Sequence, residues 1–167
     1  VRDDGTTTNG GVNLDPSADT ITINVTGVNS APSGANKTIT TNEDTAHTFT
    51  TADFGFTDPN DSPADTFASV RIATLPAAGA LRTNGTPVSA GQDISAADIT
   101  GGDLTFTPAT NAAGTSYASF TFQVRDDGGT IDGGADLDPS PNTITINVTA
   151  VNDPPVAVSD TVTVTKD

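Results

Sequence analysis

The residues of this chain best suited to chemistry are carboxylate and carboxamide side chains gathered in short loops. Asp58, Asn60 and Asp61 fall within four positions of one another, beside two prolines, and Asp126 and Asp127 are adjacent in a Gly-rich loop. Such oxygens are ligands of hard divalent cations, because calcium takes about six to eight carboxylate, amide and carbonyl oxygens. The full candidate set for binding Ca²⁺ is Asn29, Glu43, Asp44, Asp58, Asn60, Asp61, Asp126, Asp127, Asn152 and Asp153.

Other chemistries fit these residues less well. Asp is also favoured in loops and turns for purely structural reasons, because its side chain bonds the nearby backbone. One His, His47, and no Cys provide no basis for a zinc site or a Ser-His triad. Two adjacent acids such as Asp126 and Asp127 do not make the spaced pair of a glycosidase. We therefore expect the protein not to be an enzyme and His47 to be structural.

Composition restricts the possible partners. The formal net charge is −15, with 21 acidic against six basic residues, which disfavours nucleic acid and favours cations. Without cysteine there is no disulfide framework. No apolar run approaches the roughly 18 residues of a membrane span, so this segment is not expected to insert into a membrane.

The elements that must position the acidic loops occur more than once. Residues 1–44 align without a gap on residues 124–167, a shift of 123, with 25 of 44 positions identical. Self-similarity at a fixed period indicates a tandem array of one structural unit. The sequence therefore predicts the end of one repeat at residues 1–30, a complete repeat at residues 31–150, and the linker and first strand of a third at residues 151–167.

The complete repeat is expected to be all-β. Residues 143–149 alternate strictly between apolar and polar, as do the identical residues 20–26, which predicts half-buried strands. Asn84-Gly85 is a strong hairpin signal, and residues 94–99 allow one helical turn. Further strands are expected near residues 38–40, 46–50, 68–75, 103–107 and 120–124. The predicted fold is a seven-stranded antiparallel β-sandwich of immunoglobulin or cadherin-like type.

Strand parity then places the loops. When successive strands alternate in direction, odd-numbered connections share one end of a sandwich and even-numbered connections share the other. Glu43 and Asp44 are therefore expected beside Asn152 and Asp153. The remaining candidates are expected at the opposite end, where the chain enters the domain: Asn29, Asp58, Asn60, Asp61, Asp126 and Asp127.

Four segments in this order carry a family resemblance. They are Val-Asn-Asp-Pro-Pro-Val-Ala at residues 151–157, Thr-Asn-Glu-Asp-Thr at 41–45, Phe-Thr-Asp-Pro-Asn-Asp at 56–61, and Phe-Thr-Phe-Gln-Val-Arg-Asp-Asp-Gly at 120–128. Together they resemble the cadherin-like tandem repeats of large bacterial surface proteins, including the extender regions of repeats-in-toxin adhesins. The resemblance implies an extracellular spacer at the bacterial cell surface, with adjacent repeats of the same chain as partners and calcium between them.

Two departures and two alternatives accompany this interpretation. Ser30 stands where the second linker has Asp153, and Lys166 stands where the complete repeat has Glu43, so calcium binding is expected to vary along the array.

One alternative is a segment of a self-assembling filament or sheath, with neighbouring copies completing one another's sheets. The other is a carbohydrate-binding module, which the absence of Trp and the single Tyr disfavour.

Overall fold

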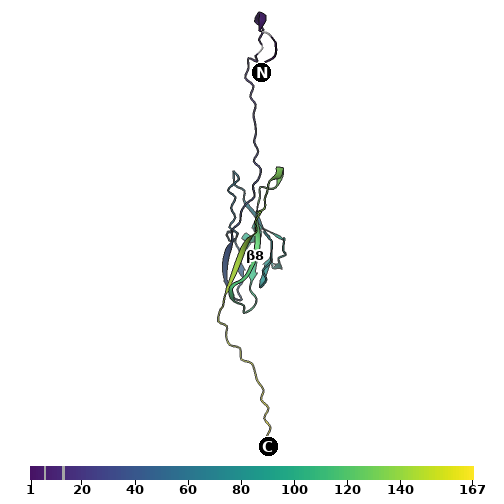
Figure 1. The fold of residues 1–167 in the computed structure, drawn as a ribbon. Helices are drawn as coiled ribbons and strands as arrows, with labels where there is room; N and C mark the ends of the chain where they lie inside the picture. Colours follow the sequence, from purple (N-terminus) through teal and green to yellow (C-terminus); the bar gives the residue numbers. More distant parts are fainter. Residues whose placement is uncertain (6, 13) are drawn as a thin grey trace.

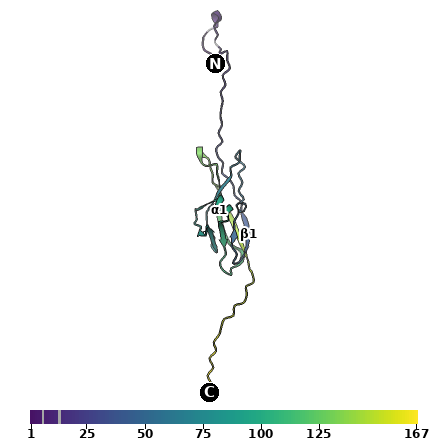
Figure 2. The same ribbon diagram turned by 180° about the vertical axis from the view of Figure 1, so that it is seen from behind.

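Two β-sheets form the centre of the computed structural model, which describes residues 1–5, 7–12 and 14–167 (Figures 1 and 2). The first sheet has the order β1 (Lys37–Asn42), β9 (Asn142–Thr149), β8 (Gly114–Asp126), β3 (Phe67–Ile72), β6 (Asp93–Ser95). The second has the order β2 (His47–Thr48), β7 (Leu104–Thr107), β4 (Ala80–Thr83), β5 (Thr86–Pro87). The helical elements described are α1 (Ala96–Gly101) and the 3-10 turns η1 (Thr8–Gly10), η2 (Thr51–Asp53) and η3 (Ile131–Gly133).

The core lies between the sheets and follows the predicted alternation. In β9, the side chains of Ile144, Ile146 and Val148 are buried while the intervening residues are only partly covered. Successive side chains on a strand point to opposite faces, so one face packs inward. The rings of Phe54 and Phe122, 5.0 Å apart between centroids, meet edge to face in the same core. The expectation of an all-β protein with two sheets is confirmed.

Local signals specify two connections between strands. Asn84 and Gly85 both have positive φ, 50° and 73°, as the turn joining β4 to β5 requires. The residues expected to form one helical turn divide between two elements, because Ile94 lies in β6 and the helix begins afterwards. Ser95 caps α1 by accepting a hydrogen bond from the Asp98 N–H, and Gly102 ends it with φ 83°.

The strand arrangement departs from a seven-stranded antiparallel sandwich in two respects. The described residues form nine strands: β4 and β5 are the hairpin expected around Asn84-Gly85, and the short β6 is a strand that was not expected. The first and last strands, β1 and β9, pair in parallel, with Ile39 beside Ile146, so the antiparallel expectation is wrong for this pair. Strand parity accounts for the direction. In the expected set of seven alternating strands, the first and the seventh, which correspond to β1 and β9, run the same way.

Strand pairing brings the acidic loops to two ends of the sandwich. The start of β3 lies beside the end of β8, with Phe67 opposite Asp126, so the loop before β3 and the loop after β8 meet. We call this end, which also contains Asn29, the N-terminal pole. At the other end Asn42 lies beside Thr149, which joins the turn after β1 to the chain leaving β9. We call this end the C-terminal pole.

Two expected strands are not formed. Residues 20–26 and the residues after 151 have no strand assignment, although residues 20–26 are identical in sequence to residues 143–149. A strand requires neighbours that complete its hydrogen bonds. Residues 143–149 have β1 and β8 on their two sides, whereas no strand described in the chain pairs with residues 20–26. The alternation shows which side chains share a face, but it does not supply the neighbouring strand that pairing requires.

Across the described residues, no helix has both the length and the hydropathy needed to span a membrane.

Candidate metal centre

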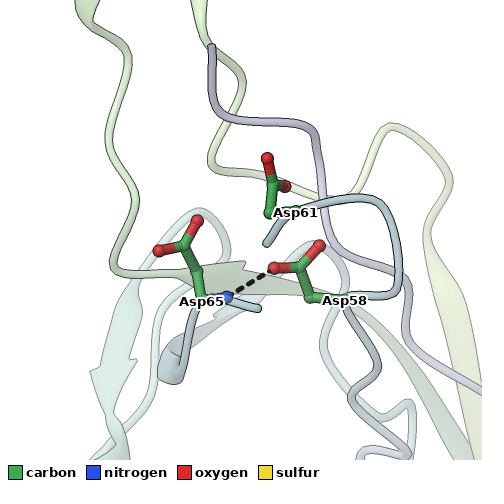
Figure 3. Close-up of side chains that lie close together, drawn as sticks. All are labelled: Asp58, Asp61 and Asp65. Atoms are coloured by element: carbon green, nitrogen blue, oxygen red, sulfur yellow. Dashed lines mark hydrogen bonds between the residues drawn. The ribbon is translucent and has the colours of Figure 1, made fainter. Parts of the chain in front are cut away.

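Three carboxylates of a single loop gather at the N-terminal pole. One ligand atom from each of Asp58, Asp61 and Asp65 lies within 4.8 Å of the other two. Figure 3 shows the three side chains around a common space, with the Asp65 backbone N–H donating to the Asp58 carboxylate at 2.8 Å. Like charges at this separation repel, so a bound cation would stabilise the arrangement. This cluster can hold a metal ion.

The Asp58 carboxylate is buried, with 7% of the residue exposed. The chain before it is fixed because Thr57 and Ser33 exchange backbone hydrogen bonds of 2.8 Å. One Asp58 oxygen, Oδ2, accepts the Asp65 N–H, and the other, Oδ1, has no hydrogen-bond partner within the described chain. A buried oxygen without a partner loses its hydration and gains nothing in return. It is therefore a candidate metal ligand.

Asp126 repeats this arrangement from a different element. It is the last residue of β8 and is 2% exposed. Its Oδ1 accepts hydrogen bonds from the Asn29 amide and the Gly128 N–H, each 3.0 Å long. Its Oδ2 is buried and lacks a partner among the described residues. Two buried carboxylates thus each use one oxygen and leave the other unpaired.

Asn29 contributes a third unpaired oxygen from the linker that enters the domain. Its amide nitrogen donates to Asp126 Oδ1 and to the carbonyls of Gly129 and Ala135, at 2.9 to 3.0 Å. Its buried Oδ1 has no donor in the part of the chain described. A Cβ placed on Gly128 would lie 2.5 Å from that oxygen and 2.3 Å from Asp65 Oδ2. Glycine at position 128 therefore lets the linker oxygen and the acidic loop approach each other.

The electrostatics of the site favour a positive charge. Burial, followed by repulsion from Asp126, Asp61, Asp127 and Asp58, raises the pKa of Asp65. Burial also raises the pKa of Asp126, although the bonds from Asn29 and Gly128 oppose this increase. Protons and metal ions are two means of compensating this crowded negative charge. At neutral pH, a divalent cation is the ligand that the arrangement suits best.

Among the described residues, the other predicted residues of this pole, Asn60, Asp61 and Asp127, have no buried oxygen without a hydrogen-bond partner. Asn60 lies exposed in the same loop as Asp58. The Asp127 carboxylate accepts from the Thr66 N–H and hydroxyl at 2.6 and 2.8 Å, which holds the two loops together. The backbone bond from Thr66 lowers the pKa of Asp127. Asp61 Oδ2 accepts the Ser30 N–H at 3.0 Å and so fixes the linker as well.

The C-terminal pole gathers the remaining predicted residues. Glu43 is 8% exposed, and its carboxylate accepts the Val151 N–H. The Asn111 amide, oriented with its nitrogen toward the acids, donates to Asp44 Oδ2 at 3.2 Å and to Asp153 Oδ2 at 3.0 Å. Asn152 follows Val151 in the chain and is exposed. Strand parity thus predicted the membership of both poles, but within the described structure none of these carboxylates has a buried oxygen without a partner.

The candidate ligand set omitted two acidic residues. Asp65 belongs to the same loop as Asp58 but was not in the candidate set, and its carboxylate faces the same space as that of Asp58 (Figure 3). Asp138 is 3% exposed and accepts hydrogen bonds from Gly34, Asn142 and Ser140 at 2.8 to 2.9 Å. The sequence signal for Asp138 is the motif Leu-Asp-Pro-Ser, which occurs at residues 14–17 and again at 137–140 and is typical of a turn.

Comparison of the chain with models of known protein families, with curated proteins and with solved structures finds no match.

Proposed function

We propose that this chain is a structural extender repeat of a large extracellular bacterial adhesin, stiffened by calcium at the junctions between domains. The observation that carries the proposal is the position of three buried, unpaired oxygens. Asp58 Oδ1, Asp126 Oδ2 and Asn29 Oδ1 come from three separate segments and lie where the linker enters the sandwich. An ion bound there would connect the linker to the domain.

The identity of the ion follows from the donor set. The cluster offers three carboxylates, from Asp58, Asp61 and Asp65. The unpaired buried oxygens of Asp126 and Asn29 lie at the same pole and add a further carboxylate and an amide oxygen. Calcium accepts this mixture of oxygens in irregular geometry, whereas magnesium requires a near-ideal octahedron and retains several waters. Extracellular calcium modules have dissociation constants of about 10⁻⁴ to 10⁻³ M, which suits a protein outside the cell.

The proposed fold type is the cadherin-like branch of the immunoglobulin sandwiches. Support comes from the five-stranded sheet facing a four-stranded one, and from β1 pairing in parallel with the last strand. With its termini at opposite poles, such a domain transmits force along its length (Figure 1). Adjacent repeats of the same chain are the proposed partners, and the proposed role is mechanical.

Isothermal titration calorimetry with calcium and then magnesium tests the proposal. The wild-type chain should bind calcium with release of heat and bind magnesium more weakly, and Asp58→Asn should reduce the calcium affinity at least tenfold. Asp132→Asn is the matched control: it makes the same charge change in the exposed η3 turn and should leave binding unchanged. Equal calcium affinities for the two variants would refute the site, because affinity would then depend only on net charge.

A scattering experiment addresses the mechanical role. Two complete repeats in tandem should give a long, sharply defined maximum dimension by small-angle X-ray scattering in calcium, and a shorter average dimension in chelator. Asp58→Asn in the second repeat should make the calcium profile resemble the chelator profile. Identical profiles in both conditions, together with confirmed calcium binding, would leave the metal site standing and remove the spacer function.

A further inference from the structure

The first and last strands of the sandwich, β1 and β9, are the only parallel pair among the strands described. Six consecutive residue pairs join them, from Lys37 beside Ile144 to Asn42 beside Thr149. In the part of the chain that the structure describes, β1 has this one neighbour in its sheet, whereas β9 lies between β1 and β8. β1 is therefore held in the sheet along one side.

The chain reaches β1 and leaves β9 at opposite poles. The linker that contains Asn29 comes in at the N-terminal pole, and Val151 follows β9 at the C-terminal pole (Figures 1 and 2). Because the two strands run in the same direction, tension along the chain pulls β1 toward the N-terminal pole and β9 toward the C-terminal pole. The strands are thus pulled in opposite directions along their own axes.

This direction of pulling decides how the backbone hydrogen bonds between the two strands break. The bonds of a parallel pair are evenly spaced along the strands and run across them. Sliding one strand past the other strains all of these bonds together, whereas lifting one strand from its end breaks them one after another. A pair that is forced to slide should therefore resist a much larger force.

Side-chain hydrogen bonds extend the pair at the N-terminal pole. The Asn36 side-chain oxygen accepts the Thr143 N–H at 2.7 Å. The Asp138 carboxylate accepts the Gly34 N–H at 2.8 Å and the Asn142 amide at 2.9 Å, through the same oxygen. These bonds tie the chain that precedes β1 to the beginning of β9.

Glu43 closes the pair at the C-terminal pole. Its N–H donates to the Thr149 carbonyl at 2.9 Å, and its carboxylate accepts the Val151 N–H. Glu43 is 8% exposed, and hydrogen bonds are electrostatically stronger in a buried, low-dielectric setting than in water. The chain that leaves β9 is therefore fixed to the end of β1.

We propose that β1, β9 and these end contacts form a mechanical clamp that resists tension along the chain. Rupture should begin with β1, since removing β9 would break the hydrogen bonds on both of its sides. Ile39, which is 6% exposed, would leave the core together with β1. The biological use of the clamp rests on the proposed function as a spacer, whereas its resistance to force requires no bound ion.

Single-molecule force spectroscopy in chelator tests the clamp, and the lack of cysteine allows attachment at chosen residues. Val1→Cys with Asp167→Cys pulls β1 and β9 in opposite directions. Val1→Cys with Ser140→Cys, at an exposed residue just before β9, pulls both strands from the N-terminal pole. At the same loading rate, we expect a rupture force several-fold higher in the first geometry.

Equal rupture forces in the two geometries would overturn the proposal, because the direction of pulling would then have no effect on the β1–β9 pair. The measurement is made without metal, so its outcome is independent of whether the chain binds calcium. Failure of the clamp would leave the calcium site standing, and failure of the calcium site would leave the clamp standing.

A matched pair of substitutions separates the clamp from overall stability, since forced unfolding follows the unfolding rate. Asn36→Ala removes the oxygen that accepts a β9 N–H. Thr74→Ala removes the oxygen that accepts the Thr121 N–H of β8 at 2.9 Å, outside the clamp. Both residues are exposed, and both variants should lower the urea midpoint to a similar extent.

Only Asn36→Ala should lower the rupture force when the two strands are pulled in opposite directions. Equal reductions in both variants would contradict the clamp, because the force would then follow overall stability. An unchanged force in Asn36→Ala would contradict it as well, because the contact at the N-terminal pole would then carry no tension.

Discussion

Replacing Asp126 with Asn should stabilise the protein in chelator and destabilise it in calcium. The substitution keeps the size of the side chain and removes one buried charge. The carbonyl oxygen of the introduced amide would still accept from Asn29 and Gly128, as Asp126 Oδ1 does at 3.0 Å. The new amide nitrogen would occupy the position of the unpaired Oδ2.

The expected gain in the free energy of unfolding without metal arises from the unpaired Oδ2 of Asp126. A buried polar group without a partner costs about 1 to 3 kcal/mol, and more when it is charged. Asp65 and Asp58 both repel Asp126 electrostatically, so an amide N–H in place of Oδ2 faces acceptors rather than like charge. We expect the free energy of unfolding in chelator to rise by about 1 kcal/mol, the low end of that range, because side chains around a mutated site relax.

Calcium should reverse the order of stability. A ligand present at about a hundredfold its dissociation constant stabilises the native state by about 2.7 kcal/mol. Asp126→Asn removes one charged ligand and weakens binding, so the variant gains less than the wild type at the same calcium concentration. The wild type should therefore unfold at higher urea concentration than the variant in calcium, and at lower concentration in chelator.

The assay is urea unfolding followed by far-ultraviolet circular dichroism, because the chain has no Trp and a single Tyr. Four curves, two proteins in two conditions, give the comparison directly. The reasoning fails if the variant is destabilised by the same amount in calcium and in chelator. That outcome would mean that Asp126 acts only as an acceptor for Asn29 and Gly128, and that no ion is bound through its second oxygen.

Two further predictions use matched substitutions, and a third concerns pH. Ile146→Ala should cost about 2 to 5 kcal/mol in urea unfolding because Ile146 is fully buried, whereas Ile23→Ala, in an identical stretch of sequence, should change stability by less than about 0.5 kcal/mol. Gly128→Ala should abolish calcium binding in calorimetry by placing a methyl group against Asn29 and Asp65, whereas Gly114→Ala, which meets no atom within 4 Å, should not. In chelator, the stability gained by Asp126→Asn should shrink as pH falls. The raised folded-state pKa of Asp126 destabilises the wild type fully above that pKa, and this penalty is lost as pH falls through it toward the ordinary value of 3.8.

Sequence patterns predicted those parts of the fold that depend on neighbours close in the chain. Alternation identified the inward residues of β9, and Asn84-Gly85 identified the hairpin. The same alternation failed at residues 20–26, where the pattern is identical but no strand lies alongside in the described structure. Periodicity states which face of a strand is apolar; it does not state whether a partner exists.

For the candidate site too, sequence reasoning predicted some features and not others. Parity of strand direction was sufficient to place Asn29 with Asp58 and Asp126, and Glu43 with Asp153. It did not distinguish a carboxylate that is fully bonded, such as Asp127, from one with a free buried oxygen, such as Asp126. That difference depends on which backbone N–H groups each loop presents, and loop sequences rich in Asp and Gly permit many such arrangements.

The two poles differ in a way that bears on how an array of repeats would respond to calcium. At the N-terminal pole, the linker residue Asn29 and the loop acids are in place within this chain, and buried oxygens remain free. At the C-terminal pole, Glu43 already accepts the Val151 N–H, and Asp44 and Asp153 share the Asn111 amide. An ion bound at the first pole would fix the linker to the domain that follows it without any contribution from the domain before. In an array of such repeats, each junction would then respond to calcium independently of the others, and no docking between two domains would be required.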